Sequence, residues 1–233
     1  MTGGRRGGAV ATETGSVVDS SAARAEILRR IRAANGAAAD GARTELEWRA
    51  IERNYRREAT RSHDEVLNLL EDRLLDYDAH VVRAAADDVT AAVAKMLSER
   101  GHKRLVIPQG LDAALLPAGF DFSVDQGLSA VELDGFDGVM TRATLAIAET
   151  GSVVLQNIAG QGRRVVTLVP DYHLCLVKAA DVVETVPEAM KRLQATAELP
   201  TTFFSGPSAT ADIEMTRIKG VHGPRFLDVI LLT

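Results

Sequence analysis

The chain has 233 residues, of which 46% are hydrophobic, enough for one sizeable core or a core with an appendage. Charged residues make up 25%, and the formal net charge of −5 excludes a globally basic field for nucleic acid. Aromatic residues are only 4% of the chain, which argues against a base-stacking surface.

One cysteine, Cys175, excludes an internal disulfide and an iron–sulfur cluster ligated by cysteines of this chain. It lies in the apolar run 173–177 (HLCLV), which predicts a buried and inert thiol. No apolar run reaches the ~18 residues that a membrane span needs. Arg5 and Arg6 have no apolar core behind them, so we expect no secretory signal and a cytoplasmic protein.

Residues 1–20 are rich in Gly, Ser and Thr, and this composition predicts a disordered tail. Within it, residues 13–18 (ETGSVV) repeat residues 149–154 letter for letter. Two interpretations are open, a swapped copy of the later turn and a coincidence. The flanking residues do not match, which favours coincidence.

Residues 21–78 have the pattern of a helical arm. Ser21 can cap a helix over 21–34, and a linker then leads to a second helical pattern over 44–77. This second pattern carries four arginines that can bind an anion, although acidic neighbours favour an ordinary solvated face. The four are Arg53, Arg56, Arg57 and Arg61. We interpret the arm as an appendage or a partner-binding element.

From residue 79 onward, strand-like and helix-like segments alternate. Residues 80–83 and 104–107 predict strands, and the helix expected between them, over 86–100, ends before Gly101. Such a βαβ unit implies a parallel sheet covered by helices. Further strands are expected at 138–141, 146–147, 152–155, 165–169, 173–177, 202–204 and 226–231, with a helix over 187–197. The strand-dense stretch favours a mixed, largely parallel sheet in an α/β fold.

Glu149 is the sharpest candidate for chemistry. It follows an apolar run and precedes Thr150, Gly151 and Ser152 in a turn between expected strands. Apolar surroundings would raise the pKa of its carboxyl group and suit it to proton transfer or nucleophilic attack. A carboxylate that only accepts backbone N–H bonds in the turn is the alternative.

Two other segments carry candidate binding groups. His173 either points into a cleft or satisfies a hydrogen bond in the core. The Gly-rich loop 156–164 either clamps a phosphate or carboxylate through Arg163 or Arg164, or is a solvated hairpin. No phosphate-loop or dinucleotide fingerprint is present.

Near the end of the sequence, Ser208 can cap a helix over 209–215, whose free amides favour an anion. Asp212 and Glu214 would then complement the helix dipole. The histidines show no metal-ligand spacing, so we expect no metal site; a cluster of His173 and His222 with one of these carboxylates is the weaker alternative.

Four motifs together resemble the LutC/YkgG family, which is also called the LUD domain. They are residues 148–155 (AETGSVVL), 168–170 (LVP) with His173, 205–214 (SGPSATADIE) and 220–224 (GVHGP). The likeness covers roughly residues 81–232. It implies a NagB/RpiA/CoA-transferase-like fold, a three-layer α/β/α sandwich over residues 79–233 with the helical arm before it.

The resemblance also implies a role in oxidising L-lactate to pyruvate together with two iron–sulfur subunits. Any cluster would then belong to those partners, and we expect no cofactor in this chain. The family's motifs imply a pocket with Glu149 as its catalytic candidate. The ligand-binding candidates are Thr150, Gly151, Ser152, His173, Ser205, Gly206, Ser208, Asp212, Glu214, His222 and Gly223.

Three functions remain open at this point. The first is a subunit or accessory protein of the lactate-oxidising complex. The second is a stand-alone acyl- or CoA-transferase-like or sugar-phosphate enzyme that uses Glu149. The third is a binding protein for a small carboxylate, without chemistry of its own.

Overall fold

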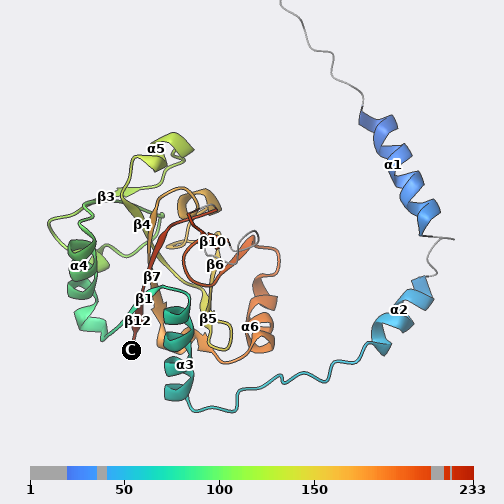
Figure 1. Cartoon of the computed structure of the whole chain (residues 1–233), viewed down its shortest axis with the longest axis horizontal. Coiled ribbons are helices and arrows are strands. Elements are labelled where there is room, and N and C mark those ends of the chain that lie inside the picture. Colours follow the sequence, from blue (N-terminus) through green and yellow to red (C-terminus); the bar gives the residue numbers. More distant parts are fainter. Residues whose placement is uncertain (1–19, 36–40, 211–217, 221) are drawn as a thin grey trace, which may run out of the picture. The chain divides into compact units, whose positions relative to one another are not determined.

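The structure is a computed structural model that describes residues 20–35, 41–210, 218–220 and 222–233 (Figure 1). The chain separates into two compact units, Met1–Asn54 and Tyr55–Thr233. The expected disordered tail and the 13–18 repeat lie outside the described residues, except for Ser20 at the start of the first helix.

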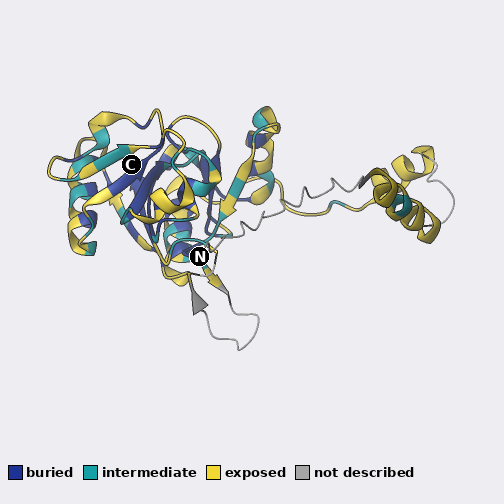
Figure 2. Cartoon of the chain, turned by 90° about the horizontal axis from the view of Figure 1, so that it is seen from above, coloured by how far each residue is buried: buried dark blue, intermediate teal, exposed yellow. Residues whose placement is uncertain are grey.

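The first unit contains helices α1 (Ser20–Ala34) and α2 (Gly41–Ala50), and the first of them confirms the helix expected over 21–34. No described residue from 21 to 54 is buried, and both helices are almost entirely exposed in Figure 2. Ion pairs three and four residues apart support the helices; Glu26, for example, accepts from Arg29 and Arg30. Among the described residues, these helices therefore have no buried face from which to obtain stability.

The single helical pattern expected over 44–77 is wrong in its middle. Residues 51–62 are not helical, and α3 (His63–Asp76) begins as a separate helix. Ser62 caps it in a capping box: its hydroxyl accepts the Glu65 N–H, while its own N–H donates to the Glu65 carboxylate. The capping box fixes the start of a new helix. The four arginines that precede it, Arg53, Arg56, Arg57 and Arg61, therefore lie in a non-helical segment.

Six parallel strands form the main sheet, in the order β1-β12-β7-β4-β2-β3. They are β1 (His80–Ala84), β2 (Arg104–Ile107), β3 (Asp121–Val124), β4 (Gly138–Arg142), β7 (Tyr172–Lys178) and β12 (Phe226–Leu232). A second sheet has the order β8-β5-β6-β9 and mixes parallel with antiparallel pairs. Its strands are β5 (Leu145–Ile147), β6 (Ser152–Gln156), β8 (Val182–Val183) and β9 (Thr201–Phe204). The α/β class is confirmed, and the mixed pairing belongs to the small sheet.

Helices and short turns complete this unit. The α-helices are α4 (Val89–Arg100), α5 (Ala130–Asp134) and α6 (Val186–Leu193). The 3-10 helices are η1 (Ala86–Asp88), η2 (Ala113–Leu115), η3 (Arg164–Thr167), η4 (Ala179–Asp181) and η5 (Gln194–Thr196). A two-stranded ribbon pairs β10 (Ala209–Thr210) with β11 (Ile218–Lys219). Of the described helices, none is long and apolar enough to cross a membrane.

The core is built in layers around the main sheet. Val93 and Leu97 of α4 pack with strand residues on one face. On the other face, Leu70 and Leu74 of α3 pack in one cluster with residues of both sheets. The small sheet presents its remaining face to α6, where Leu193 is buried. Helix α3 therefore belongs to the α/β core rather than to the exposed helices of the first unit.

Two local expectations are wrong. Residues 164–167 form η3 instead of a strand, because local N–H···O=C bonds such as Val166 to Arg163 replace pairing with a neighbouring strand. Ala209–Thr210 is a strand rather than the start of a helix. The Ser208 hydroxyl accepts the His222 N–H at 3.0 Å, so it is occupied across the loop instead of capping a helix.

Candidate functional site

A pocket of about 270 Å³ gathers three of the four motifs that the sequence singled out. The predicted residues that line it are His173, Ser205, Gly206, Ser208, His222 and Gly223. They come from the start of β7, the turn after β9 and the turn before β12. Segments far apart in the sequence thus meet where two strands of the main sheet begin.

His173 is a buried side chain at this pocket, only 2% exposed. Its Nε2 atom shares a hydrogen bond of 2.8 Å with the Thr141 hydroxyl, and its ring centre lies 5.3 Å from that of Phe204. Burial, aided by the nearby Arg164 charge, lowers the pKa of His173 to about 3. The imidazole is therefore neutral at pH 7. His173 therefore satisfies a hydrogen bond in the core and also lines a pocket, so the two interpretations do not exclude each other.

Arg164 supplies the positive charge of the pocket. It donates to the Thr167 hydroxyl at 3.2 Å and forms no ion pair with any described carboxylate. Its neighbour Arg163 is instead held by the Asp125 carboxylate through two bonds of 2.7 Å. Of the two arginines weighed as an anion clamp, only Arg164 is placed at the pocket and has its charge unpaired among the described residues.

A chain of hydroxyl groups connects the first motif to the pocket. Thr150 Oγ1 lies 2.7 Å from Ser152 Oγ, which lies 2.8 Å from Ser205 Oγ. Gly151 between them has φ of +59°, and a Cβ atom there would lie 2.8 Å from the Arg73 Cβ. A glycine is required at this position because the turn packs directly on helix α3.

The two turns that close the pocket are bonded to each other. Ser208 N–H donates to the Pro224 carbonyl at 2.8 Å, and the Ser208 carbonyl accepts the Gly220 N–H at 2.9 Å. With the His222 N–H bond, Ser208 carries three of the contacts that join these turns. Its bonded hydroxyl thus positions the turn that presents His222 and Gly223.

Glu149 does not line this pocket. Its side chain is 38% exposed and forms an ion pair with Arg56, whose guanidinium also reaches the buried Glu184. The apolar surroundings expected for Glu149 are therefore wrong, because an arginine from residues 51–62 faces it. Asp212 and Glu214 lie outside the described residues. Among the described residues, no three of His, Cys, Asp and Glu are placed to hold a metal ion.

The sequence and the fold of this chain are similar to those of known proteins. The family profile described as "LUD domain" matches residues 9–232. The chain belongs to the LUD domain family. This membership agrees with the resemblance carried by the four motifs.

Several relatives of this LUD protein have names or structures. Lactate utilization protein C of Deinococcus radiodurans is 42% identical over 174 residues, covering 73% of this chain and 81% of that protein. The uncharacterized protein YkgG of Escherichia coli is 30% identical, covering 57% of this chain and 64% of that protein. The crystal structure of a DUF162 family protein from D. radiodurans matches with a TM-score of 0.66 at 36% identity, covering 75% of this chain and 100% of that one.

Sequence reasoning missed some polar side chains at the LUD pocket. Thr167 and Thr202 line it, while the buried Thr141 lies outside its lining and is bonded to His173 Nε2. Thr141 is the one hydroxyl in the apolar run 138–141 (GVMT), and this interruption was the available signal. Thr167 interrupts the apolar run 165–169 (VVTLV) in the same way.

Proposed function

We propose that this LUD protein serves lactate utilisation as a subunit or accessory protein of an iron–sulfur-dependent complex that oxidises L-lactate to pyruvate. The similarity to Lactate utilization protein C of D. radiodurans supports this assignment. The structural observation that carries it is the pocket where Arg164, otherwise without a described ion-pair partner, adjoins neutral His173.

The chemistry of the pocket suits a small hydroxy or keto acid. The Arg164 guanidinium would bind the carboxylate, since charge-assisted bonds to arginine are strong and directional. The hydroxyl of Ser205 lies in the same pocket and can bond to the substrate hydroxyl or keto oxygen. A volume of about 270 Å³ suits such a compound better than a large cofactor.

Oxidation of lactate releases two electrons and two protons, so it needs an electron acceptor. In this proposal iron–sulfur clusters on partner subunits accept the electrons, because the single cysteine of this chain is buried in the core. The exposed helices α1 and α2 would dock those partners, and the complex would work in the cytoplasm. The layered sheets support a NagB/RpiA/CoA-transferase-like three-layer assignment, with the small sheet as an addition.

The alternative enzyme, an acyl- or CoA-transferase-like or sugar-phosphate enzyme, needs Glu149 at the reacting centre. The Arg56 ion pair gives this alternative less support, because it occupies the Glu149 carboxylate. A carboxylate-binding protein without chemistry would use the same pocket, and growth experiments distinguish it from the first proposal.

The test combines binding and growth. Titration calorimetry should detect L-lactate or pyruvate with wild type, and Arg164→Gln should weaken binding about tenfold or more, because it removes a charge-assisted bond. The neutral amide of lactate should bind no better to wild type than to Arg164→Gln. The variant Lys178→Gln, which removes an exposed charge outside the pocket, is the matched control.

Deletion of the gene in a host without another lactate-oxidising route should abolish growth on L-lactate. Wild type should restore it, and Glu149→Gln should restore it as well. Binding without a growth defect would favour the carboxylate-binding protein. Unchanged growth together with no binding of either acid would overturn the lactate proposal.

A further inference from the structure

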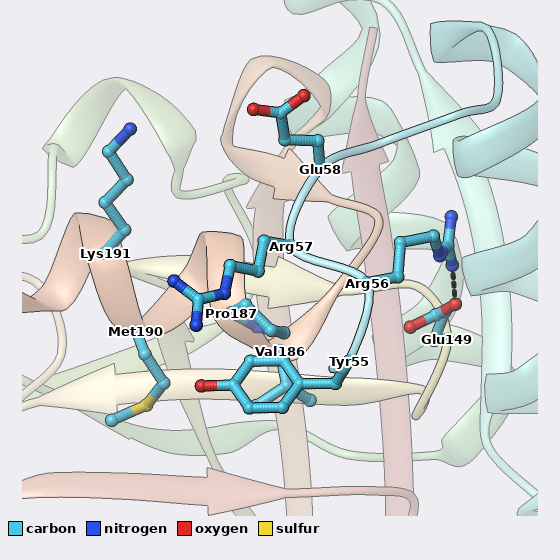
Figure 3. A pocket seen from close by; sticks show the side chains of 9 residues that line it. All are labelled: Tyr55, Arg56, Arg57, Glu58, Glu149, Val186, Pro187, Met190 and Lys191. Carbon is cyan, nitrogen blue, oxygen red and sulfur yellow. Dashed lines mark hydrogen bonds and ion pairs between the residues drawn. The ribbon is translucent and has the colours of Figure 1, made fainter. Parts of the chain in front are cut away.

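A second pocket lies within the Tyr55–Thr233 unit, and it shares no lining residue with the His173 pocket. Figure 3 shows it beside helix α6, with residues 55–58 as its other wall. Its volume is about 870 Å³. Ligand pockets of ~300–1,000 Å³ are typical for organic molecules, so this one has room for a ligand much larger than lactate.

Two cations face this pocket from opposite walls. Arg57 comes from the extended segment and Lys191 from α6, and neither forms an ion pair with a described carboxylate. The Arg57 guanidinium stacks over the Tyr55 ring, 5.1 Å from its centre. In Figure 3 it lies beside the Tyr55 ring, while the Lys191 ammonium and the Glu58 carboxylate extend away from it. Both charged side chains line the same pocket, so both attract an anion that binds there.

Apolar surface adjoins these charges. Tyr55 is 56% exposed, Met190 53% and Val186 39%, and Pro187 completes the wall along the first turn of α6. Large apolar side chains that gather at one exposed place mark binding sites more often than scattered ones do. Charge and apolar surface side by side select a ligand that has both an anionic group and an apolar body.

The wall that carries Arg57 is held in place from behind. Glu184 is fully buried, and its carboxylate accepts from the Arg56 guanidinium, from the Arg61 guanidinium at 2.5 Å, and from the Thr60 N–H at 2.6 Å. These bonds fix the segment on both sides of Arg57. Arg56 also pairs with Glu149, so the charge of that carboxylate is compensated and does not oppose an anion. A wall fixed in this way loses little conformational entropy when a ligand binds.

We propose that this pocket binds a small organic anion, with its carboxylate or phosphate between Arg57 and Lys191 and its apolar body against Tyr55, Pro187 and Met190. The site is separate from the one proposed for lactate. It would allow this chain to bind two different anions at once.

The test uses amide NMR spectra of the full chain with four probes. Naphthalene-1-acetate and 1-naphthyl phosphate carry an anion and an apolar body. Naphthalene-1-acetamide lacks the charge, and inorganic phosphate lacks the apolar body. Saturable shifts at Tyr55, Arg57, Val186 and residues 188–191 are expected with both naphthyl anions. The amide and inorganic phosphate should each bind about tenfold or more weakly, because each loses one of the two contributions.

Variants assign the binding to the named residues. Arg57→Gln and Lys191→Gln should each weaken naphthalene-1-acetate about tenfold, while Arg192→Gln, on the same helix outside the pocket, should leave it unchanged. Circular dichroism would confirm that each variant is folded. Equal binding of acetate and acetamide, shifts located elsewhere, or equal losses in Lys191→Gln and Arg192→Gln would overturn the proposal. A preference between the two naphthyl anions would identify the headgroup.

Discussion

Replacing Glu184 by Gln should show how strongly residues 55–61 are fixed to the α/β unit. Both carboxylate oxygens accept bonds: one from the two guanidiniums of Arg56 and Arg61, the other from the backbone N–H groups of Thr60 and Arg61. A glutamine offers one oxygen and one NH₂ group. In either orientation it therefore turns a donor toward donors, and at least two bonds are lost.

The pKa of Glu184 gives the magnitude. Burial by itself raises this pKa, but the bonds from Arg56, from the Arg61 and Thr60 backbone and from the Arg61 side chain outweigh burial and lower it from 4.5 to about 2. At 1.36 kcal/mol per unit, this lowering corresponds to about 3 kcal/mol of stability at pH 7. Because the folded-state pKa is lowered, the stability is present above pH 4.5 and is lost as pH falls toward 2.

Urea unfolding at several pH values between 7 and 3 measures this contribution. The free energy of unfolding of Glu184→Gln should be about 3 kcal/mol below wild type at pH 7, and the gap should narrow below pH 4.5. Limited trypsin digestion should cut the variant faster after Arg56, Arg57 and Arg61 because the segment detaches. Glu149→Gln is the control: its partner Arg56 is partly exposed, so the loss should stay below about 1 kcal/mol. A gap that does not change with pH would refute the reasoning.

Three further predictions concern the core and the pocket. The ring resonances of His173 should not titrate between pH 5 and 8, since burial lowers its pKa to about 3. Below pH 6.5 the unfolded chain binds a proton at this residue and the folded chain does not, so the free energy of unfolding should fall as the pH falls. A midpoint near neutrality in a histidine NMR titration would contradict this. Cys175 should resist iodoacetamide at pH 8 in the folded protein and react after unfolding in urea, because burial raises its pKa to about 12. Mass spectrometry would measure the label, and fast labelling of the folded protein would disprove the burial argument. In the same urea assay, Gly138→Ala should destabilise the fold by about 2 kcal/mol or more, because the new Cβ would lie 2.8 Å from the Tyr172 carbonyl oxygen. Gly119→Ala is the comparison: its Cβ would have open space but its φ is +89°, so it separates the packing effect from backbone strain.

Regular elements with local signals could be predicted from the sequence. Helix α4 ends where Gly101 adopts a left-handed φ of +71°, and the buried strands β2 and β7 follow from their continuous apolar runs. The starts of α3 and α5 also had a signal, since Ser62 with Glu65 and Ser129 with Glu132 form capping boxes.

Other features depend on contacts between distant residues. The 165–169 segment has the composition of a buried strand, yet it pairs with no described strand, and its first part folds into η3. Nothing near Glu184 in the sequence indicates that arginines more than 120 residues away would bury it. For the same reason, the motif residues could be named from the sequence, but the separation of Glu149 from the His173 pocket could not.

The order of strands in the main sheet has a consequence for the synthesis of this chain. β1 pairs with β12, and His80 lies opposite Asp228, so the first strand of the sheet has its partner in the last. At ~5–20 residues per second, a ribosome needs on the order of ten seconds to make the intervening chain. During that interval the backbone edge of β1 has no neighbouring strand, and α3 has no completed sheet to pack against. The apolar residues of β1 and α3 are therefore not covered by a finished sheet until β12 has been made.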